Sequence, residues 1–110
     1  MTTTTGRPFN EDELISQIGH MNILAISGGR VIVVKNNDGE TIEVELKCGA
    51  GYRVSIALGW DDTYTVTRQY VRKGTVFNKG TVEGVYCDNI GEVAYKAACF
   101  RSYEFGKAVA

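Results

Sequence analysis

The spacing of apolar residues changes twice along the chain, and each change predicts a change of secondary structure. Near the N-terminus, Leu14 and Ile18 recur at helical spacing after Asn10, a residue type that caps helix N-termini. Gly19 can end this helix, because glycine readily adopts the left-handed conformation found after many helices. The pattern therefore predicts a short amphipathic helix over residues 10–19.

Beyond this helix, the pattern changes to alternating apolar and polar residues, or to short apolar runs. These segments are rich in Val, Ile, Thr and Tyr, which strands favour, and turn-like connectors separate them. The expected strands are ILAIS at 23–27, RVIVVK at 30–35, TIEVELK at 41–47, YRVSIALGW at 52–60 and TYTVTRQYV at 63–71. Because short connections join antiparallel neighbours, the segments predict a meander of four or five strands.

After residue 81 the apolar residues return to steps of three or four. The members of this series are Val82, Val85, Tyr86, Ile90, Val93, Ala94, Ala97 and Phe100. They predict an amphipathic helix over 82–100, which Gly84 and Gly91 weaken and can delay or bend. The whole order predicts an α+β fold: an N-terminal helix, an antiparallel meander and a C-terminal helix, both helices packed on one sheet face.

One domain accounts for the pattern. The chain has 110 residues, enough to bury a single core without a disulfide or a metal. We expect residues 1–9 to be a disordered lead, residues 10–105 to form the α+β domain, and residues 106–110 to be a flexible tail. Tyr103 and Phe105 can fold back onto the domain.

Charge and cysteine content narrow the classes of function. Twelve basic and 13 acidic residues give a net charge of −1, so the chain has no overall attraction to nucleic acid or to an anionic membrane. No apolar run is long enough to span a bilayer. Three widely spaced cysteines without an export signal predict reduced thiols and a cytoplasmic location. His20 is the only histidine, so we expect no metal site and no cofactor.

Ser27-Gly28-Gly29 could be a phosphate-binding loop or a tight turn. ATP pyrophosphatases of the PP-loop type carry Ser-Gly-Gly, an apolar residue and then Asp-Ser, with the loop running into a helix. Here Arg30 and Val31 follow, and the β-branched run after them favours a strand, which offers no converging helix amides to a phosphate. The sequence instead predicts a two-residue hairpin turn at Gly28-Gly29.

The other candidate catalytic groups have ordinary structural interpretations. Asp61 and Asp62 are typical of a solvated turn, and Glu43 and Glu45 are expected on the solvated face of a sheet. Cys87 and Cys99 fall in the expected second helix, where we predict buried, inert thiols. We therefore expect no catalytic residues and no enzyme activity.

The strongest local signal is the basic and aromatic segment RQYVRKGTVFNK, residues 68–79. It contains Arg68, Tyr70, Arg72, Lys73, Phe77 and Lys79 and no acidic residue. Because basic residues hold phosphates and aromatic rings stack on bases, this segment is a candidate nucleic-acid interface. Arg53 marks a second candidate surface, the side of strand 52–60 with small residues, where a partner or a second copy of the chain could approach.

Three segments, QIGHMNILAISGGRV, DTYTVTRQYVRKG and GEVAYKAACFRSYEF, resemble small proteins encoded by actinobacteria and their phages. The resemblance covers roughly residues 14–105 and carries over no functional residue. It implies a context: small phage proteins without catalytic motifs often act by stoichiometric binding to a host protein, and inhibitors of host defence such as anti-CRISPR proteins are one class. The expected function is therefore non-enzymatic protein binding in the host cytoplasm, with nucleic-acid binding through 68–79 as the alternative.

Overall fold

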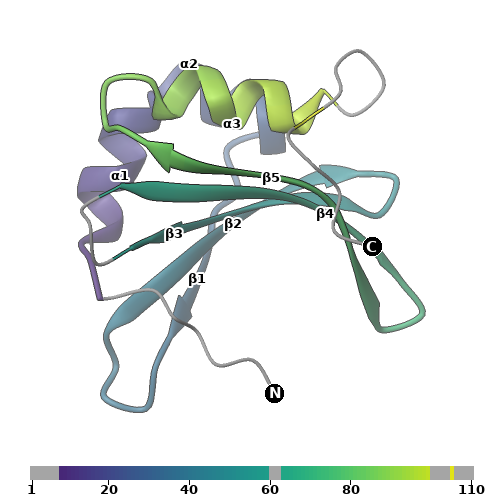
Figure 1. Ribbon diagram of the computed structural model, residues 1–110, viewed down its shortest axis with the longest axis horizontal. Helices are drawn as coiled ribbons and strands as arrows, with labels where there is room; N and C mark the ends of the chain where they lie inside the picture. The colour runs from purple at the N-terminus through teal and green to yellow at the C-terminus, as the bar shows by residue number, and fades with distance from the viewer. Residues whose placement is uncertain (1–7, 60–62, 100–104, 106–110) are drawn as a thin grey trace.

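Three helices lie on one face of a five-stranded sheet in the computed structural model, which describes residues 8–59, 63–99 and 105 (Figure 1). The elements are α1 (Glu11–Ile18), α2 (His20–Ser27), β1 (Ile32–Lys35), β2 (Thr41–Gly49), β3 (Tyr52–Leu58), β4 (Tyr64–Arg72), β5 (Thr75–Val85) and α3 (Ile90–Ala98). The strands pair in the order β1-β2-β3-β4-β5, each antiparallel to the next. This arrangement confirms the α+β fold, the meander and the C-terminal helix packed on the sheet. Among the described residues, no helix combines the length and the apolar character that crossing a membrane requires.

The first helix begins and ends where the sequence predicts. The Asn10 side-chain oxygen accepts hydrogen bonds from the backbone amides of Asp12 (2.8 Å) and Glu13 (3.2 Å), so it satisfies two of the donors that a helix N-terminus leaves unpaired. Leu14 is buried in the core, and Gly19, with φ 96°, ends the helix. The cap and the apolar spacing therefore define α1 locally.

Residues 23–27 form a helix, so the prediction of a strand followed by a Gly28-Gly29 hairpin is wrong. Ile23 and Ile26 are three residues apart and both are buried, which places them on one helical face. Gly28 has φ 67° and caps α2, and the amides of both glycines donate back to carbonyls of the last helical turn. A short apolar run fits a strand or a helix equally well by periodicity, and here packing on the sheet decides for the helix.

The final helix starts later than residue 82, the start given by the apolar spacing. Val82 and Val85 belong to β5, where they pair with Val66 and Tyr64 of β4. The helix begins only at Ile90, so the predicted helix over 82–100 is wrong in its first part. Cys87 lies in the turn before α3 and is exposed, which contradicts its predicted burial on the helix.

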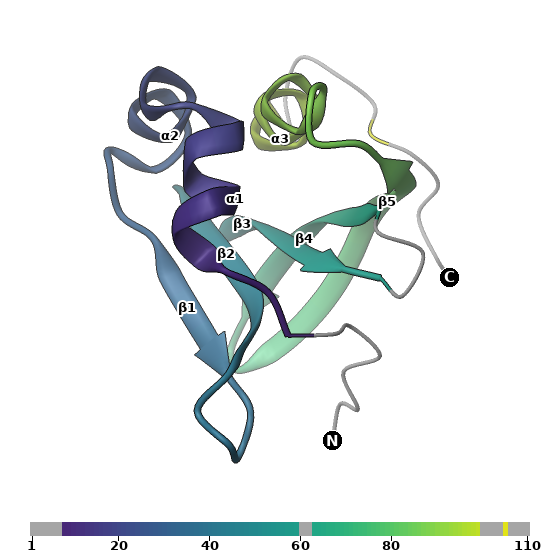
Figure 2. The same cartoon turned by 90° about the vertical axis from the view of Figure 1, so that its left-hand side faces the viewer.

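The helices cover one face of the sheet (Figure 2), and the core lies between the two layers. Its largest fully buried side chains are Leu14, Ile18, Leu46, Ile56, Ile90, Val44, Val54 and Val66. The backbone approaches closely at two glycines, Gly91 and Gly80. A Cβ at Gly91 of α3 would lie 2.5 Å from the carbonyl oxygen of Ile18 in α1, so only glycine fits there. At Gly80 of β5 a Cβ would overlap the carbonyl of Phe105, which is buried and confirms that the chain folds back at this residue. Tyr103 and the pair Asp61 and Asp62 lie outside the described residues.

Candidate binding surface

The β4–β5 hairpin projects from the domain on the side away from the helices (Figure 1). It reverses at Lys73 and Gly74, whose φ angles are 52° and 79°, between the paired residues Arg72 and Thr75. A two-residue loop with positive φ at both positions is a type I′ turn, whose backbone twist matches the right-handed twist of the two strands it joins. This hairpin is not predicted from the sequence, because the apolar residues after 81 fit helical spacing. Gly74 between two β-branched runs is the signal that indicates its turn.

Three aromatic rings from three neighbouring strands form one row, which we call the aromatic row: Tyr52, Tyr70 and Phe77. Strand register places them opposite one another, Tyr52 beside Tyr70 and Tyr70 beside Phe77, so they share one face of the sheet. Their ring centroids are 4.9 Å and 6.3 Å apart. Phe77 is 45% exposed, so the row runs out to solvent along the hairpin.

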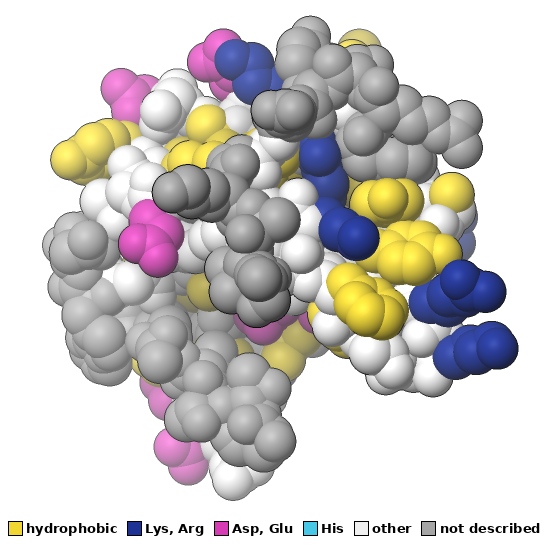
Figure 3. Space-filling view, turned by 45° about the vertical axis from the view of Figure 1, so that its right-hand side comes forward, with side chains coloured by type: hydrophobic (Ala, Val, Ile, Leu, Met, Phe, Trp, Pro, Cys, Tyr) yellow, Lys and Arg dark blue, Asp and Glu magenta, His cyan; other side chains and the backbone are white. Residues whose placement is uncertain are grey.

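Cations surround the outer end of the aromatic row. The Lys79 ammonium lies 5.9 Å from the centre of the Phe77 ring, within the range of a cation–π interaction. Arg72 and Lys73 are exposed at the hairpin tip. Figure 3 shows hydrophobic side chains bordered by Lys and Arg on this side of the molecule. The structure thus brings five of the seven predicted site residues, Tyr70, Arg72, Lys73, Phe77 and Lys79, together at the outer part of one hairpin.

Arg68, the sixth predicted site residue, is a structural residue. Only 5% of it is exposed, and its Nε donates to the Ala97 carbonyl (2.7 Å) while Nη2 donates to the Lys96 carbonyl (3.0 Å). Its guanidinium also lies 5.4 Å from the centre of the Phe105 ring. Burial lowers the pKa of this guanidinium from its usual value. Arg68 therefore joins the C-terminal end of α3 to β4 and is not presented to a partner.

Arg53, the seventh, lies on the opposite face of the sheet from the aromatic row. Its Nε donates to the Gln69 side chain (2.6 Å), and its guanidinium is 3.4 Å from the Glu45 carboxylate. The Ser55 hydroxyl donates to Glu43 on the same face. Burial raises the pKa of Glu45, whose side chain is 12% exposed, and Arg53 partly offsets that rise. The prediction that these two carboxylates lie on a solvated face therefore fails for Glu45.

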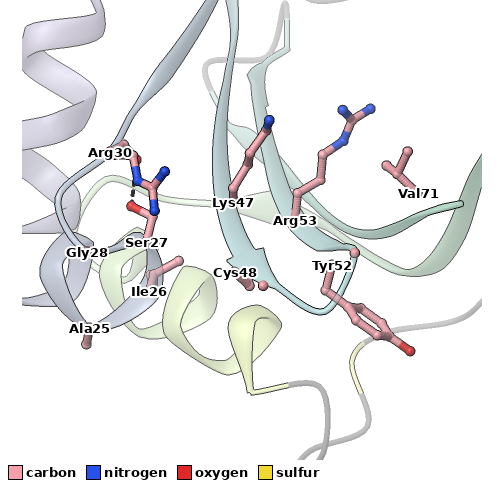
Figure 4. A pocket seen from close by; sticks show the side chains of 12 residues that line it. Ala25, Ile26, Ser27, Gly28, Arg30, Lys47, Cys48, Tyr52, Arg53 and Val71 are labelled. Carbon is pink, nitrogen blue, oxygen red and sulfur yellow. Dashed lines mark hydrogen bonds between the residues drawn. The ribbon is translucent and has the colours of Figure 1, made fainter. Parts of the chain in front are cut away.

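A pocket of about 650 Å³ lies between the end of α2 and the turn that joins β2 to β3 (Figure 4). Its lining includes three cations, Arg30, Lys47 and Arg53, and no acidic residue. Cys48 also lines it, and burial raises the pKa of this thiol to about 11, so the thiol stays protonated near neutral pH. Sequence reasoning missed this pocket, because its walls come from segments that periodicity alone does not bring together.

Within residues 8–59, 63–99 and 105, no three His, Cys, Asp or Glu side chains gather closely enough to hold a metal ion. Comparison with known proteins gave no match to a protein-family model, to a curated protein or to a solved structure.

Proposed function

We propose that this chain is a non-enzymatic binding protein that acts by stoichiometric contact with another protein. The observation that carries the proposal is the aromatic row, which runs to solvent on a projecting hairpin whose outer part, residues 70–79, carries only positive charges. Aromatic and arginine side chains supply most of the binding energy in protein interfaces, and a rim of one charge selects the partner. The partner surface would present an apolar pocket for Phe77 and acidic groups around it.

Within this proposal the partner is a host protein and the chain is an inhibitor of a host defence system, such as a CRISPR–Cas complex. This step rests on the resemblance of the sequence to small actinobacterial phage proteins. In this proposal the interaction takes place in the host cytoplasm. The hairpin supports the proposal because a projection of two paired strands loses less conformational entropy on binding than an unpaired loop does.

A pair of alanine variants tests the proposed contact surface. The tagged chain is used to capture partners from actinobacterial lysates, and Phe77→Ala is compared with Tyr86→Ala. Tyr86 is 62% exposed but lies outside the hairpin, so it controls for the loss of any surface aromatic ring. We expect a stoichiometric partner that the parent and Tyr86→Ala retain and Phe77→Ala loses. Capture that is equally strong with Phe77→Ala, or no stoichiometric partner in any host tested, would reject the proposal.

Single-stranded nucleic acid is the second candidate partner. The observation that favours it is the placement of three rings on adjacent strands beside Arg72, Lys73 and Lys79, because such platforms stack bases while cations hold the phosphates. Arg72→Glu with Lys73→Glu should abolish a salt-dependent gel shift of single-stranded DNA or RNA. The matched control, Lys35→Glu with Lys96→Glu, makes the same charge change outside the hairpin. If the parent gives no shift, or both double variants behave alike, this candidate fails.

A further inference from the structure

The pocket beside α2 exists because β1 covers only part of β2. Pairing between the two strands ends at Ile32 and Glu45, so from Leu46 onward β2 has no strand beside it on that edge among the described residues. The chain between α2 and β1, which includes Arg30, instead lines a pocket of about 650 Å³ at this edge. This volume is within the range of sites for small organic ligands.

Two of the three cations that line this pocket, Arg30 and Lys47, have no ion-pair partner among the described residues. Arg30 and Lys47 are exposed, and neither has a carboxylate within ion-pair distance in the part of the chain that the structure describes, while Arg53 shares Glu45. Figure 4 shows Lys47 and Arg53 extending to the same side of the sheet, with the Arg30 side chain directed toward β2. Because Arg30 and Lys47 add unpaired positive charge to one cavity, a bound anion would offset that charge.

The uncharged part of the lining indicates that the anion carries an organic group. Ile26 and Val71 contribute apolar surface, and Gly28, Gly49 and Gly51 leave backbone accessible at the rim. An inorganic anion alone would leave this apolar wall in contact with water. A ligand with phosphates at one end and a flat or apolar group at the other would use both parts.

Ser27 and Gly28 line the pocket, but they do not act as a phosphate loop. They form the C-terminal end of α2, where the helix dipole disfavours an anion, and the Gly28 amide already donates to the Leu24 carbonyl (2.9 Å). The positive charge must therefore come from side chains. We propose that this pocket binds a small phosphorylated organic molecule of the nucleotide type, whose phosphates contact Arg30 and Lys47.

Calorimetric titration of the full chain with ADP, pyrophosphate and adenosine tests this site. We expect ADP to bind most tightly, pyrophosphate more weakly and adenosine least. Arg30→Ala with Lys47→Ala should weaken ADP binding by roughly 100-fold, about tenfold for each charge-assisted contact. Lys35→Ala with Lys96→Ala removes two exposed cations elsewhere and should leave ADP binding unchanged. Because Arg30 and Lys47 are exposed, their variant should keep the unfolding temperature of the parent.

Two further measurements make the result decisive. Amide chemical shifts require no variant, and ADP should perturb Gly49 and Gly51 at the pocket rim. A single-stranded oligonucleotide separates a free nucleotide from a nucleic-acid phosphate. Binding of the oligonucleotide but not of ADP, with loss in Arg72→Glu/Lys73→Glu, would assign the phosphate to the hairpin and overturn the pocket proposal. Absence of ADP and pyrophosphate binding, or equal ADP binding by the Arg30→Ala/Lys47→Ala variant, would also overturn it, whatever the fate of the protein-binding proposal.

Discussion

Replacing Arg68 tests whether this arginine stabilises the fold or contacts a partner. Arg68→Met keeps a long, flexible side chain in the core but removes both hydrogen bonds to the C-terminal end of α3. A partner-contacting residue on a surface would tolerate this change with little loss of stability. A residue that satisfies the last carbonyls of a helix would not.

The expected loss follows from which carbonyls remain without a donor. The Lys96 carbonyl also accepts from the Cys99 amide at 3.2 Å, so it keeps one partner after the substitution. The Ala97 carbonyl loses a charge-assisted hydrogen bond of 2.7 Å, which contributes about 1.5–3 kcal/mol. Loss of the cation beside the Phe105 ring adds about 0.5–1 kcal/mol, and relief of the buried charge subtracts a comparable amount. We therefore expect Arg68→Met to lower the free energy of unfolding by about 1.5–3 kcal/mol.

Urea and thermal unfolding followed by circular dichroism measure this loss. At this chain length, about 4 °C of melting temperature corresponds to each kcal/mol, so the melting temperature should fall by about 6–12 °C. Arg68→Lys, which can reach one carbonyl but not two, should fall between Arg68→Met and the parent. A free energy of unfolding for Arg68→Met within about 0.5 kcal/mol of the parent would refute the reasoning.

Three further predictions concern other parts of the core and the sheet. At about pH 8 iodoacetamide should label the exposed Cys87 before Cys48, because only about one in a thousand Cys48 thiols is ionised when the pKa of that thiol is about 11. Mass spectrometry of the labelled peptides shows the order, and earlier labelling of Cys48 would contradict the prediction. The folded chain holds a proton on Glu45 at pH values where the unfolded chain has released it, so stability should fall as pH rises from about 4.5 through the raised pKa. Urea unfolding across that range should show no such fall in Glu45→Gln, and parallel curves for the two proteins would count against the prediction. Gly91→Ala should lower the free energy of unfolding in urea by about 1–3 kcal/mol, because overlap of the new methyl group with the Ile18 carbonyl outweighs the better helix propensity of alanine. A more stable variant would show that α1 and α3 can separate freely.

Local chemistry makes part of the fold predictable. The Asn10 cap defines α1 without help from distant residues, and strict alternation correctly assigns Val44 and Leu46 to the buried face of β2. The segment at 23–27 lacks such a signal, since an apolar run of this length fits a strand or a helix. Its conformation depends on packing against β2, which the sequence pattern does not contain.

The sequence contains the signals for the pairing of Tyr70 with Phe77 on the hairpin, but not for the contacts between the hairpin and α3. Tyr70 and Phe77 meet because a two-residue turn pairs them, and both residues and Gly74 are visible in the sequence. Alternation along β4 also places Arg68 on the same face as buried Val66, which is a signal that it points inward. Its hydrogen-bond acceptors in α3 are distant along the chain, so their identity required the structure.

The contact of Gly91 with the Ile18 carbonyl has a consequence for the order in which this protein can assemble. Each strand pairs with the next along the chain, so the meander can form hairpin by hairpin as a ribosome releases it. The inner face of α1 lacks part of its cover until α3 is synthesised, after the whole sheet. A nascent chain that stalls before residue 90 would therefore leave part of α1 uncovered, and it would be a substrate for chaperones and proteases although its strands are already paired.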